Sequence, residues 1–190
     1  LFYACFYVDK KGEVPGFFLG RKLRLFPIRF GSASFVEAVE HQELREKISV
    51  FLSKIKYNGL GGIEFKRDQR DGSFQLIEFN VRYGLWDVMG ARCGVDLALM
   101  AYKDAVCEPV PFVSTYRTGV KWISLERDIA AFLGYKKEGI LSTSSWIRSL
   151  IGQKQCAVFD WRDLSPFFKT GRCYISEKGR SIFRTIFGKK

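Results

Sequence analysis

The stretch LIEFNVR, residues 76–82, contains side chains that could do chemistry along one face of a strand. In an extended strand, residues two apart share a face, so Glu78, Asn80 and Arg82 point the same way. The residues between them form an apolar face that could be buried: Ile77, Phe79 and Val81. A carboxylate, an amide and a guanidinium in a row on the other face indicate a binding surface.

The preceding segment, residues 61–68, is expected to pair with residues 73–82 as a β-hairpin. If residues 70–72 form a three-residue loop with a left-handed glycine at its end, Glu64 lies directly opposite Glu78. Two carboxylates in that position repel and destabilise a bare sheet unless a cation lies between them. The pairing therefore predicts a metal-binding floor.

The ligand types indicate which metal this floor would hold. Carboxylate and amide oxygens suit hard cations such as Mg²⁺ or Mn²⁺, so Glu64, Glu78 and Asn80 are candidate metal ligands. Because Mg²⁺ usually takes one or two protein carboxylates and fills its shell with water and phosphate oxygens, a phosphate ligand is implied. Arg82 could then grip a phosphoryl oxygen or neutralise charge during its transfer. The alternative is that both glutamates are solvated and pair with Lys66 and Arg82.

The elements that position this row follow from the hydrophobic pattern. Residues 1–9 and 14–24 are strand-like and are joined by the turn DKKGE, which predicts a β-hairpin. Residues 32–59 show helical spacing and end at an Asn-Gly pair, which predicts a helix. Its apolar positions are Leu44, Ile48, Phe51, Leu52 and Ile55. Further on, YRTGVKWISLERD indicates a strand passing into a helix, and GILSTSSWIRSLIG a helix capped by Ser or Thr.

Composition limits the class of protein. The 190 residues are 47% hydrophobic and 16% aromatic, which is ample for a packed core. A net charge of +11 favours an acidic partner such as a nucleotide, a nucleic acid or an anionic membrane, and the alternative is a basic soluble surface. The five cysteines are widely spaced with no CxxC pair, as in a cytoplasmic protein with reduced thiols. No run of 18 apolar residues predicts a transmembrane helix, and no charged start followed by an apolar core predicts a signal peptide.

Several chemistries lack their motifs. GxSxG, Walker, GxGxxG and HExxH patterns are absent from the sequence, and a single histidine, His41, argues against Ser-His or Cys-His nucleophilic catalysis. His41 lies near the predicted helix start, where a capping or solvated role is expected. Nucleic-acid binding is the main alternative function, because high positive charge with many aromatic residues fits an electrostatic groove with stacking side chains. No RNP-like or zinc-finger motif supports it.

The hairpin also resembles a known family. GGIEFKRDQRDGSFQLIEFNVRYG is similar to the metal-binding hairpin of the ATP-grasp superfamily, in which one strand carries an acidic residue and the next carries Glu-x-Asn, often followed by x-Arg. The downstream GARCGVDLALMAYKDAV resembles the helical segment of the carbamoyl-phosphate-synthase-like and D-aspartate-ligase-like branches. The resemblance covers residues 3–110. It implies an α+β fold, an antiparallel sheet with packed helices forming the C-terminal lobe over residues 1–110, followed by a smaller α/β extension over 111–190.

The resemblance implies roles for individual residues. Glu64 and Glu78 would bind the metal ions, with Glu78 bridging two of them and Asn80 completing the shell of the second. Arg82 would contact the transferring phosphate as the candidate catalytic residue. The family uses Mg-ATP to convert a carboxylate into an acyl phosphate, which an amine or similar nucleophile such as a thiol then attacks.

The segment RKLRLFP resembles the basic strand end that reaches the phosphates or the acyl phosphate in such enzymes. It makes Lys22 and Arg24 candidate residues for binding the cofactor ATP. The alternative is that both are surface charges on an edge strand.

The resemblance also implies missing parts and partners. The lobe with the glycine-rich flap, the phosphate lysines and the adenine hinge would precede Leu1, and the sequence begins inside a strand-like run. We therefore expect the C-terminal part of a longer ligase, inactive alone, with ATP, a small carboxylate, a nucleophile and the missing lobe as partners and no specific nucleic acid. The tail SEKGRSIFRTIFGKK would, as a helix, place an apolar stripe beside basic residues. It could contact a membrane surface weakly, and the alternative is a disordered or docking tail.

Overall fold

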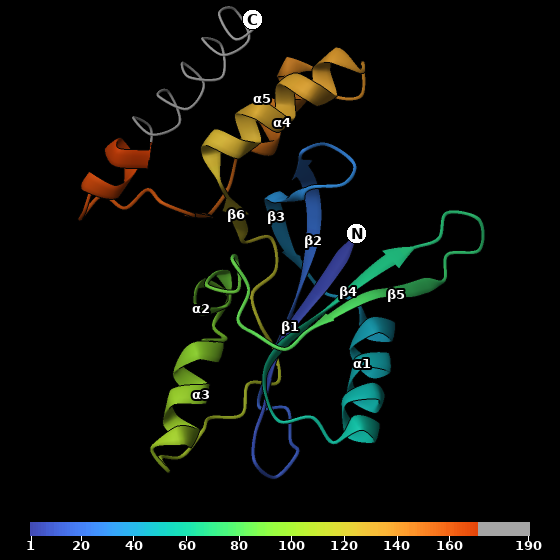
Figure 1. Ribbon diagram of the computed structural model, residues 1–190, viewed down its shortest axis with the longest axis vertical. Coiled ribbons are helices and arrows are strands. Elements are labelled where there is room, and N and C mark those ends of the chain that lie inside the picture. The colour runs from blue at the N-terminus through green and yellow to red at the C-terminus, as the bar shows by residue number, and fades with distance from the viewer. Residues whose placement is uncertain (171–190) are drawn as a thin grey trace, which may run out of the picture.

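The computed structural model describes residues 1–170, which form a seven-stranded sheet with helices packed on both faces (Figure 1). The strand order is β5-β4-β1-β2-β3-β6-β7, and every pairing is antiparallel except that of β6 with β7. The predicted α+β class is confirmed. The strands are β1 (Phe2–Val8), β2 (Gly16–Phe26), β3 (Ser32–Val39), β4 (Gly59–Arg67), β5 (Phe74–Asn80), β6 (Lys121–Ile123) and β7 (Lys154–Cys156). The helices are α1 (Gln42–Ile55), α2 (Met89–Cys93), α3 (Leu97–Ala105), α4 (Leu125–Lys137) and α5 (Thr143–Ser149).

The first hairpin forms the centre of the sheet. β1 pairs with β2 as predicted, and its other edge pairs with β4, so that Tyr3 lies opposite Glu64. Residues 3–8 are buried, as expected for a strand covered on both faces. This central position makes β1 the strand that sets the distance between the residues of β2 and β4.

The predicted helix over residues 32–59 is only partly correct. Residues Ser32–Val39 form β3, which pairs with β2 and β6, and the helix α1 begins at Gln42. A strand that is buried on both faces lacks the alternation of polar and apolar residues that marks a half-buried strand. The hydrophobic pattern therefore does not show where such a strand ends and a directly following helix begins. His41 occupies the N-cap position but its side chain makes no capping bond, and its ring packs edge-on against Phe74 with centroids 4.7 Å apart.

Two apolar clusters fill the space on the two faces of the sheet. On one face, α1 contributes Leu44, Ile48 and Leu52, which pack with residues of β1, β2 and β4. On the other face, Trp86, α2 and α3 pack against β1, β2 and β3. Figure 1 shows α1 on one side of the strands and α2 with α3 on the other. Burial on both faces gives the sheet its rigidity.

The register of the β4–β5 hairpin is confirmed where the glutamates lie and wrong near the turn. Glu64 pairs with Glu78, but Phe65 pairs with Leu76, so Ile77 is an extra residue that forms a β-bulge. The predicted three-residue loop is instead residues 69–72, because Asp68 N donates to Ser73 O at 2.8 Å. The shift in register at the turn is compensated by the bulge before the pair of glutamates.

Residues after 110 extend the same sheet. β6 pairs with β3, and α4 follows β6 directly, which confirms the predicted strand and helix. α5 is also confirmed, with Ser142 at its N-cap accepting a hydrogen bond from Ser145 N at 3.2 Å. The predicted basic tail lies outside the described residues. Among residues 1–170, no helix combines the length and the apolar character that a membrane span requires.

Core packing of α1 yields a stability test. Ile48 is 1% exposed on the inner face of α1, so Ile48→Ala should leave a cavity and lower the free energy of unfolding by about 2–5 kcal/mol. Val50, 54% exposed on the same helix, provides the control, and Val50→Ala should change it by less than about 0.5 kcal/mol. Urea denaturation measures both variants. Equal losses would contradict the packing of α1 on the sheet.

Candidate functional site

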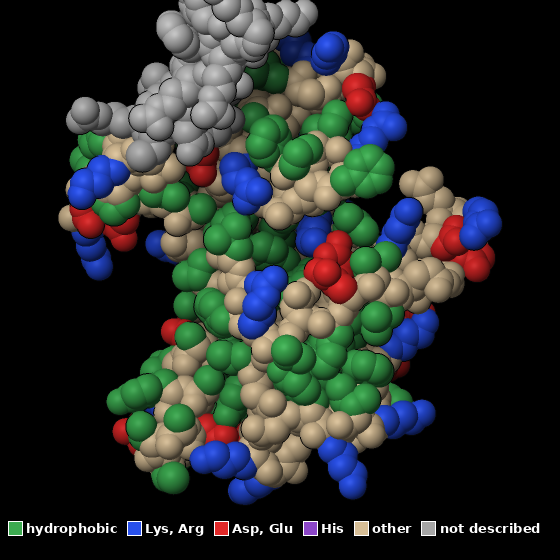
Figure 2. All heavy atoms as spheres, in the orientation of Figure 1, with side chains coloured by type: hydrophobic (Ala, Val, Ile, Leu, Met, Phe, Trp, Pro, Cys, Tyr) green, Lys and Arg blue, Asp and Glu red, His purple; other side chains and the backbone are tan. Residues whose placement is uncertain are grey.

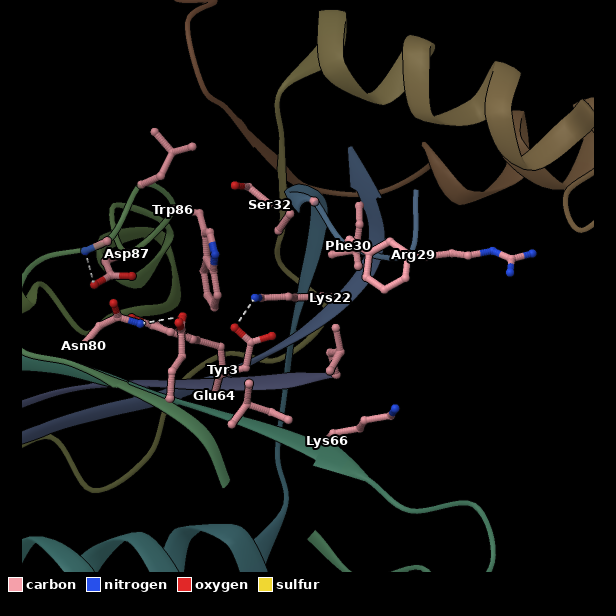
Figure 3. A pocket seen from close by; sticks show the side chains of 18 of the residues that line it. Tyr3, Lys22, Arg29, Phe30, Ser32, Glu64, Lys66, Asn80, Trp86 and Asp87 are labelled. Carbon is pink, nitrogen blue, oxygen red and sulfur yellow. Dashed lines mark hydrogen bonds and ion pairs between the residues drawn. The ribbon is translucent and has the colours of Figure 1, made fainter. Parts of the chain in front are cut away.

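A pocket of about 880 Å³ opens beside the β4–β5 hairpin. Its walls come from β1, β2, the β2–β3 turn, β4, β5 and the loop after β5 (Figure 3). Tyr3, Leu25 and Trp86 also belong to the cluster under α2 and α3, which places the pocket on that face of the sheet. In Figure 2, acidic side chains lie together in the middle of the visible face, with Lys and Arg side chains around them. The pocket thus has a rigid floor and a charged lining.

The acidic floor contains the predicted metal ligands. Glu64 is 8% exposed and accepts a hydrogen bond from Lys22 Nζ at 2.6 Å, while the paired Glu78 is exposed and accepts from Asn80 Nδ2 at 2.7 Å. All four residues line the pocket. The structure therefore brings Lys22 and the three candidate metal ligands together. The ammonium of Lys22 places a positive charge beside this pair of facing carboxylates, which reduces their repulsion.

The oxygen atoms of these side chains fit a hard cation whose coordination shell is completed by ligands from outside the protein. Within residues 1–170, no three Asp, Glu, His or Cys side chains gather as a metal-binding group. A cation here would be held by Glu64, Glu78 and the amide oxygen of Asn80. Two carboxylates and an amide leave positions for water or phosphate oxygens, which is the coordination that Mg²⁺ prefers.

An aromatic wall adjoins this floor. Lys22 Nζ lies 5.6 Å from the centre of the Tyr3 ring, and Tyr3 meets Trp86 edge-on with centroids 5.2 Å apart. Burial raises the pKa of Tyr3, so its hydroxyl stays protonated. Sequence reasoning missed both aromatic residues, since the pairing of β1 with β4 that brings Tyr3 opposite Glu64 is a long-range contact.

The β-bulge changes the chemistry of the hairpin face. Ile77 was expected on the buried apolar face, but it lines the pocket with Glu78 and is 52% exposed. Lys66, two residues after Glu64 on β4, also lines the pocket. The extra residue in the bulge places two neighbouring side chains on one face. The polar floor therefore has an apolar side chain at its edge.

A buried carboxylate holds the loop that follows β5. Asp87 is 2% exposed and accepts hydrogen bonds from Gly84 N at 2.8 Å and from Cys5 Sγ at 3.2 Å. Burial raises the pKa of Asp87, and the hydrogen bonds and the charge of Arg82 act in the opposite direction. Asp87 was also missed, although the loop VRYGLWDV directly after the candidate ligands combines a glycine with polar and aromatic residues, a signal that could have identified it.

Arg82 and Arg24 have different positions. Arg82 is exposed, lines the pocket and follows Asn80 by two residues, as the sequence predicts. Arg24 is 5% exposed and forms a bidentate ion pair with Asp128, at 2.7 and 2.9 Å, outside the pocket. The expected alternative, a surface charge on an edge strand, is wrong for Arg24 because β2 is an inner strand. Arg24 is therefore not part of the pocket that contains the other candidate residues.

Comparisons with known proteins indicate which family the chain resembles. Residues 28–112 match the family model described as carbamoyl-phosphate synthase L chain, ATP binding domain. The chain is 31% identical over 140 residues to a D-aspartate ligase of Enterococcus faecium (strain Aus0004), an alignment covering 70% of this chain and 32% of the relative. The chain thus spans about a third of the length of that curated relative.

A solved structure shares the fold. The biotin carboxylase domain of a thermophilic 2-oxoglutarate carboxylase bound to bicarbonate superposes with a TM-score of 0.51 and 21% sequence identity. The superposition covers 63% of this chain and 28% of that one. At this identity the similarity concerns the arrangement of the strands and helices.

Titration of Asp87 yields a test. Because burial raises its pKa above 3.8, the folded state binds a proton more tightly than the unfolded state. Its contribution to the free energy of unfolding should be complete below pH 3.8 and be lost as the pH rises through the raised pKa. The side chain of the Asp87→Asn variant cannot titrate. The difference in the free energy of unfolding between wild type and this variant should therefore change across this pH window and stay constant above it.

Urea denaturation at a series of pH values would measure that difference. The control is Asp163→Asn, because Asp163 is exposed. A difference that does not vary with pH for Asp87→Asn would mean that Asp87 ionises as in the unfolded chain.

Proposed function

Because the chain belongs to the ATP-grasp superfamily, we propose that it provides the metal- and phosphate-binding lobe of an ATP-dependent ligase. The ligase would activate a carboxylate as an acyl phosphate for attack by an amine or similar nucleophile. One observation carries the proposal: Glu64, Glu78 and Asn80 meet Lys22 and Arg82 around a single pocket. The similarity to a D-aspartate ligase supports the ligase class.

Glu64, Glu78 and Asn80 would hold Mg²⁺ or Mn²⁺ through oxygen atoms. When bound, the metal would neutralise phosphate charge and ATP would supply the phosphoryl group. The facing position of the two carboxylates supports this role, since it is unfavourable without a cation. The hydrogen bond from Asn80 to Glu78 already orders both side chains on the pocket face. The site would therefore need little rearrangement to bind a cation.

Lys22 would bind an anionic oxygen of the substrates. Its ammonium is directed into the pocket and held by Glu64 at 2.6 Å (Figure 3). A phosphate or carboxylate oxygen in the pocket would compete with Glu64 for the N–H donors of Lys22. Lys22 and Glu64 have side chains only 10% and 11% exposed, so their charges are weakly screened by water.

Arg82 would stabilise the charge that develops during phosphoryl transfer. It lies on the same face as Asn80 and is exposed to the pocket. Asp87, through its bond to Gly84 N, fixes the loop that follows Arg82. A guanidinium held in place before the reaction lowers the transition-state energy without having to reorganise.

Metal-dependent nucleotide binding tests the floor. In the full-length protein, Mg²⁺ with ATP or ADP should raise the melting temperature, and Glu78→Gln should abolish the increase by removing a charged ligand. Glu108→Gln is the control, because Glu108 is exposed and outside the pocket. Thermal denaturation with and without Mg²⁺ measures the effect. An equal shift in Glu78→Gln and wild type would exclude the proposed metal floor.

Kinetics test the role of Arg82. In the full-length enzyme, Arg82→Ala should lower ATP turnover about 100-fold or more with a much smaller change in nucleotide affinity, as when a preorganised charge donor is lost. Arg82→Lys should recover part of the rate, since an ammonium cannot reproduce a planar guanidinium. Arg148→Ala, an exposed position on α5, should keep normal turnover. Near-normal turnover in Arg82→Ala would mean that Arg82 is only a surface charge with no role in catalysis.

A further inference from the structure

Helix α4 is anchored to the sheet by a buried ion pair. Asp128 is fully buried, and both of its carboxylate oxygens accept hydrogen bonds from Arg24, at 2.7 and 2.9 Å. Ser34 Oγ donates to the same carboxylate at 3.3 Å and Trp146 Nε1 at 2.9 Å. Arg24 also donates to Ser149 Oγ at 2.9 Å. Strands β2 and β3 and helices α4 and α5 therefore meet at one carboxylate.

From this anchor, α4 follows the end of β2 toward the β2–β3 turn. Leu25 N donates to the hydroxyl of Tyr135 at 3.4 Å, one residue beyond Arg24. Gly134 packs against Ile28, and a Cβ added at Gly134 would lie 3.0 Å from Ile28 Cγ2. The helix thus lies close to the turn, and a larger residue at Gly134 would require the Ile28 side chain to shift by a few tenths of an ångström.

The last contact is at the tip of the turn. Arg29 Nη2 donates to Glu138 Oε2 at 2.6 Å, at the C-terminal end of α4. Arg29 has a left-handed backbone, with φ of 74°, a conformation that is unfavourable for a residue with a side chain and persists only when its surroundings maintain it. The contacts with α4 provide such surroundings.

The same turn forms part of the pocket mouth. Residues 29–33 line the pocket, and Phe30 is 95% exposed. In Figure 3 the side chain of Arg29 points away from the pocket. The charge of Arg29 is therefore directed toward α4, and the apolar ring beside it borders the opening.

We propose that α4 acts as a brace that holds the β2–β3 turn, and Phe30 with it, in position at the mouth of the pocket. Arg24, Asp128, Arg29 and Glu138 are then positioning residues for ligand binding. The identity of the ligand as a nucleotide rests on the proposed function, whereas the brace itself rests on the contacts. The extension after residue 110 thereby has a role in the site without contributing a reacting group.

Charge reversal at the tip tests the brace in a protein that still folds, because Arg29 and Glu138 are partly exposed, at 63% and 33%. Glu138→Arg and Arg29→Glu should each make amide hydrogen exchange in residues 26–32 about three- to tenfold faster. The double variant should restore exchange toward the wild-type rate, since the ion pair is re-formed in the opposite sense. The exchange is measured on the full-length protein without ligand and corrected for intrinsic rates.

A matched control uses an ion pair that joins β2 to β3 rather than the turn to α4. Arg21 and Glu37 pair at 2.8 Å and do not line the pocket, so Arg21→Glu should leave exchange in the turn unchanged. If the Glu138→Arg variant has the wild-type exchange rate in the turn, or if the double variant fails to restore it, the brace is overturned.

Nucleotide binding gives the second measurement. With MgATP as the probe in titration calorimetry, Glu138→Arg should weaken binding about three- to tenfold and the double variant should recover it. If exchange in the turn changes while wild-type MgATP affinity is retained, the turn does not control binding and the proposal is wrong. If the wild type does not bind MgATP at all, the proposed function fails, and the exchange experiment alone decides whether α4 holds the turn.

Discussion

The pocket is organised around two carboxylates that face each other across β4 and β5. Glu64 and Glu78 are directly paired, so their repulsion must be balanced by positive charge for the hairpin to be stable. In the structure Lys22 provides that charge to Glu64, and Arg82 and Lys66 line the same pocket. The charges that keep the hairpin folded are also those suited to binding anionic oxygens. Stability of the hairpin and chemistry at the pocket therefore depend on the same electrostatic balance.

The position of β1 between β2 and β4 makes this balance possible. Neighbouring strands lie about 4.8 Å apart, so Lys22 on β2 and Glu64 on β4 are separated by roughly twice that distance at the backbone. The four-carbon stem of lysine can span the gap, and it does so beside the ring of Tyr3. Because β1 is buried on both faces, the strands cannot shift to relieve the contact. The bond between Lys22 and Glu64 is thus a consequence of strand order and of side-chain length.

The extension is joined to the sheet by buried charge. Replacing a buried ion pair with apolar residues is often neutral or stabilising, so the pair Arg24–Asp128 is poorly explained by stability alone. Its directional bonds to two strands and two helices fix how α4 lies against β2 and β3. Apolar packing alone would permit sliding along the helix, whereas a carboxylate with all its bonds satisfied has one position. This specificity accounts for the regular succession of contacts from Arg24 to Arg29.

Local patterns in the sequence determined the polar row of β5, its pairing with β4 at the glutamates, the first hairpin and most of α1, because these depend on residue periodicity and short-range pairing. The boundary between β3 and α1 was not determined, since a strand covered on both faces has no alternation to mark it. The tertiary structure decided three other features of the molecule: the contact of Lys22 with Glu64, the contact of Arg24 with Asp128, and the aromatic wall of Tyr3 and Trp86. Those contacts join residues far apart in the chain, and which of them form depends on strand order and register, which are set by packing of the whole sheet rather than by neighbours in sequence. The same holds for Ile77, which enters the pocket only because the register shifts by one residue at the bulge.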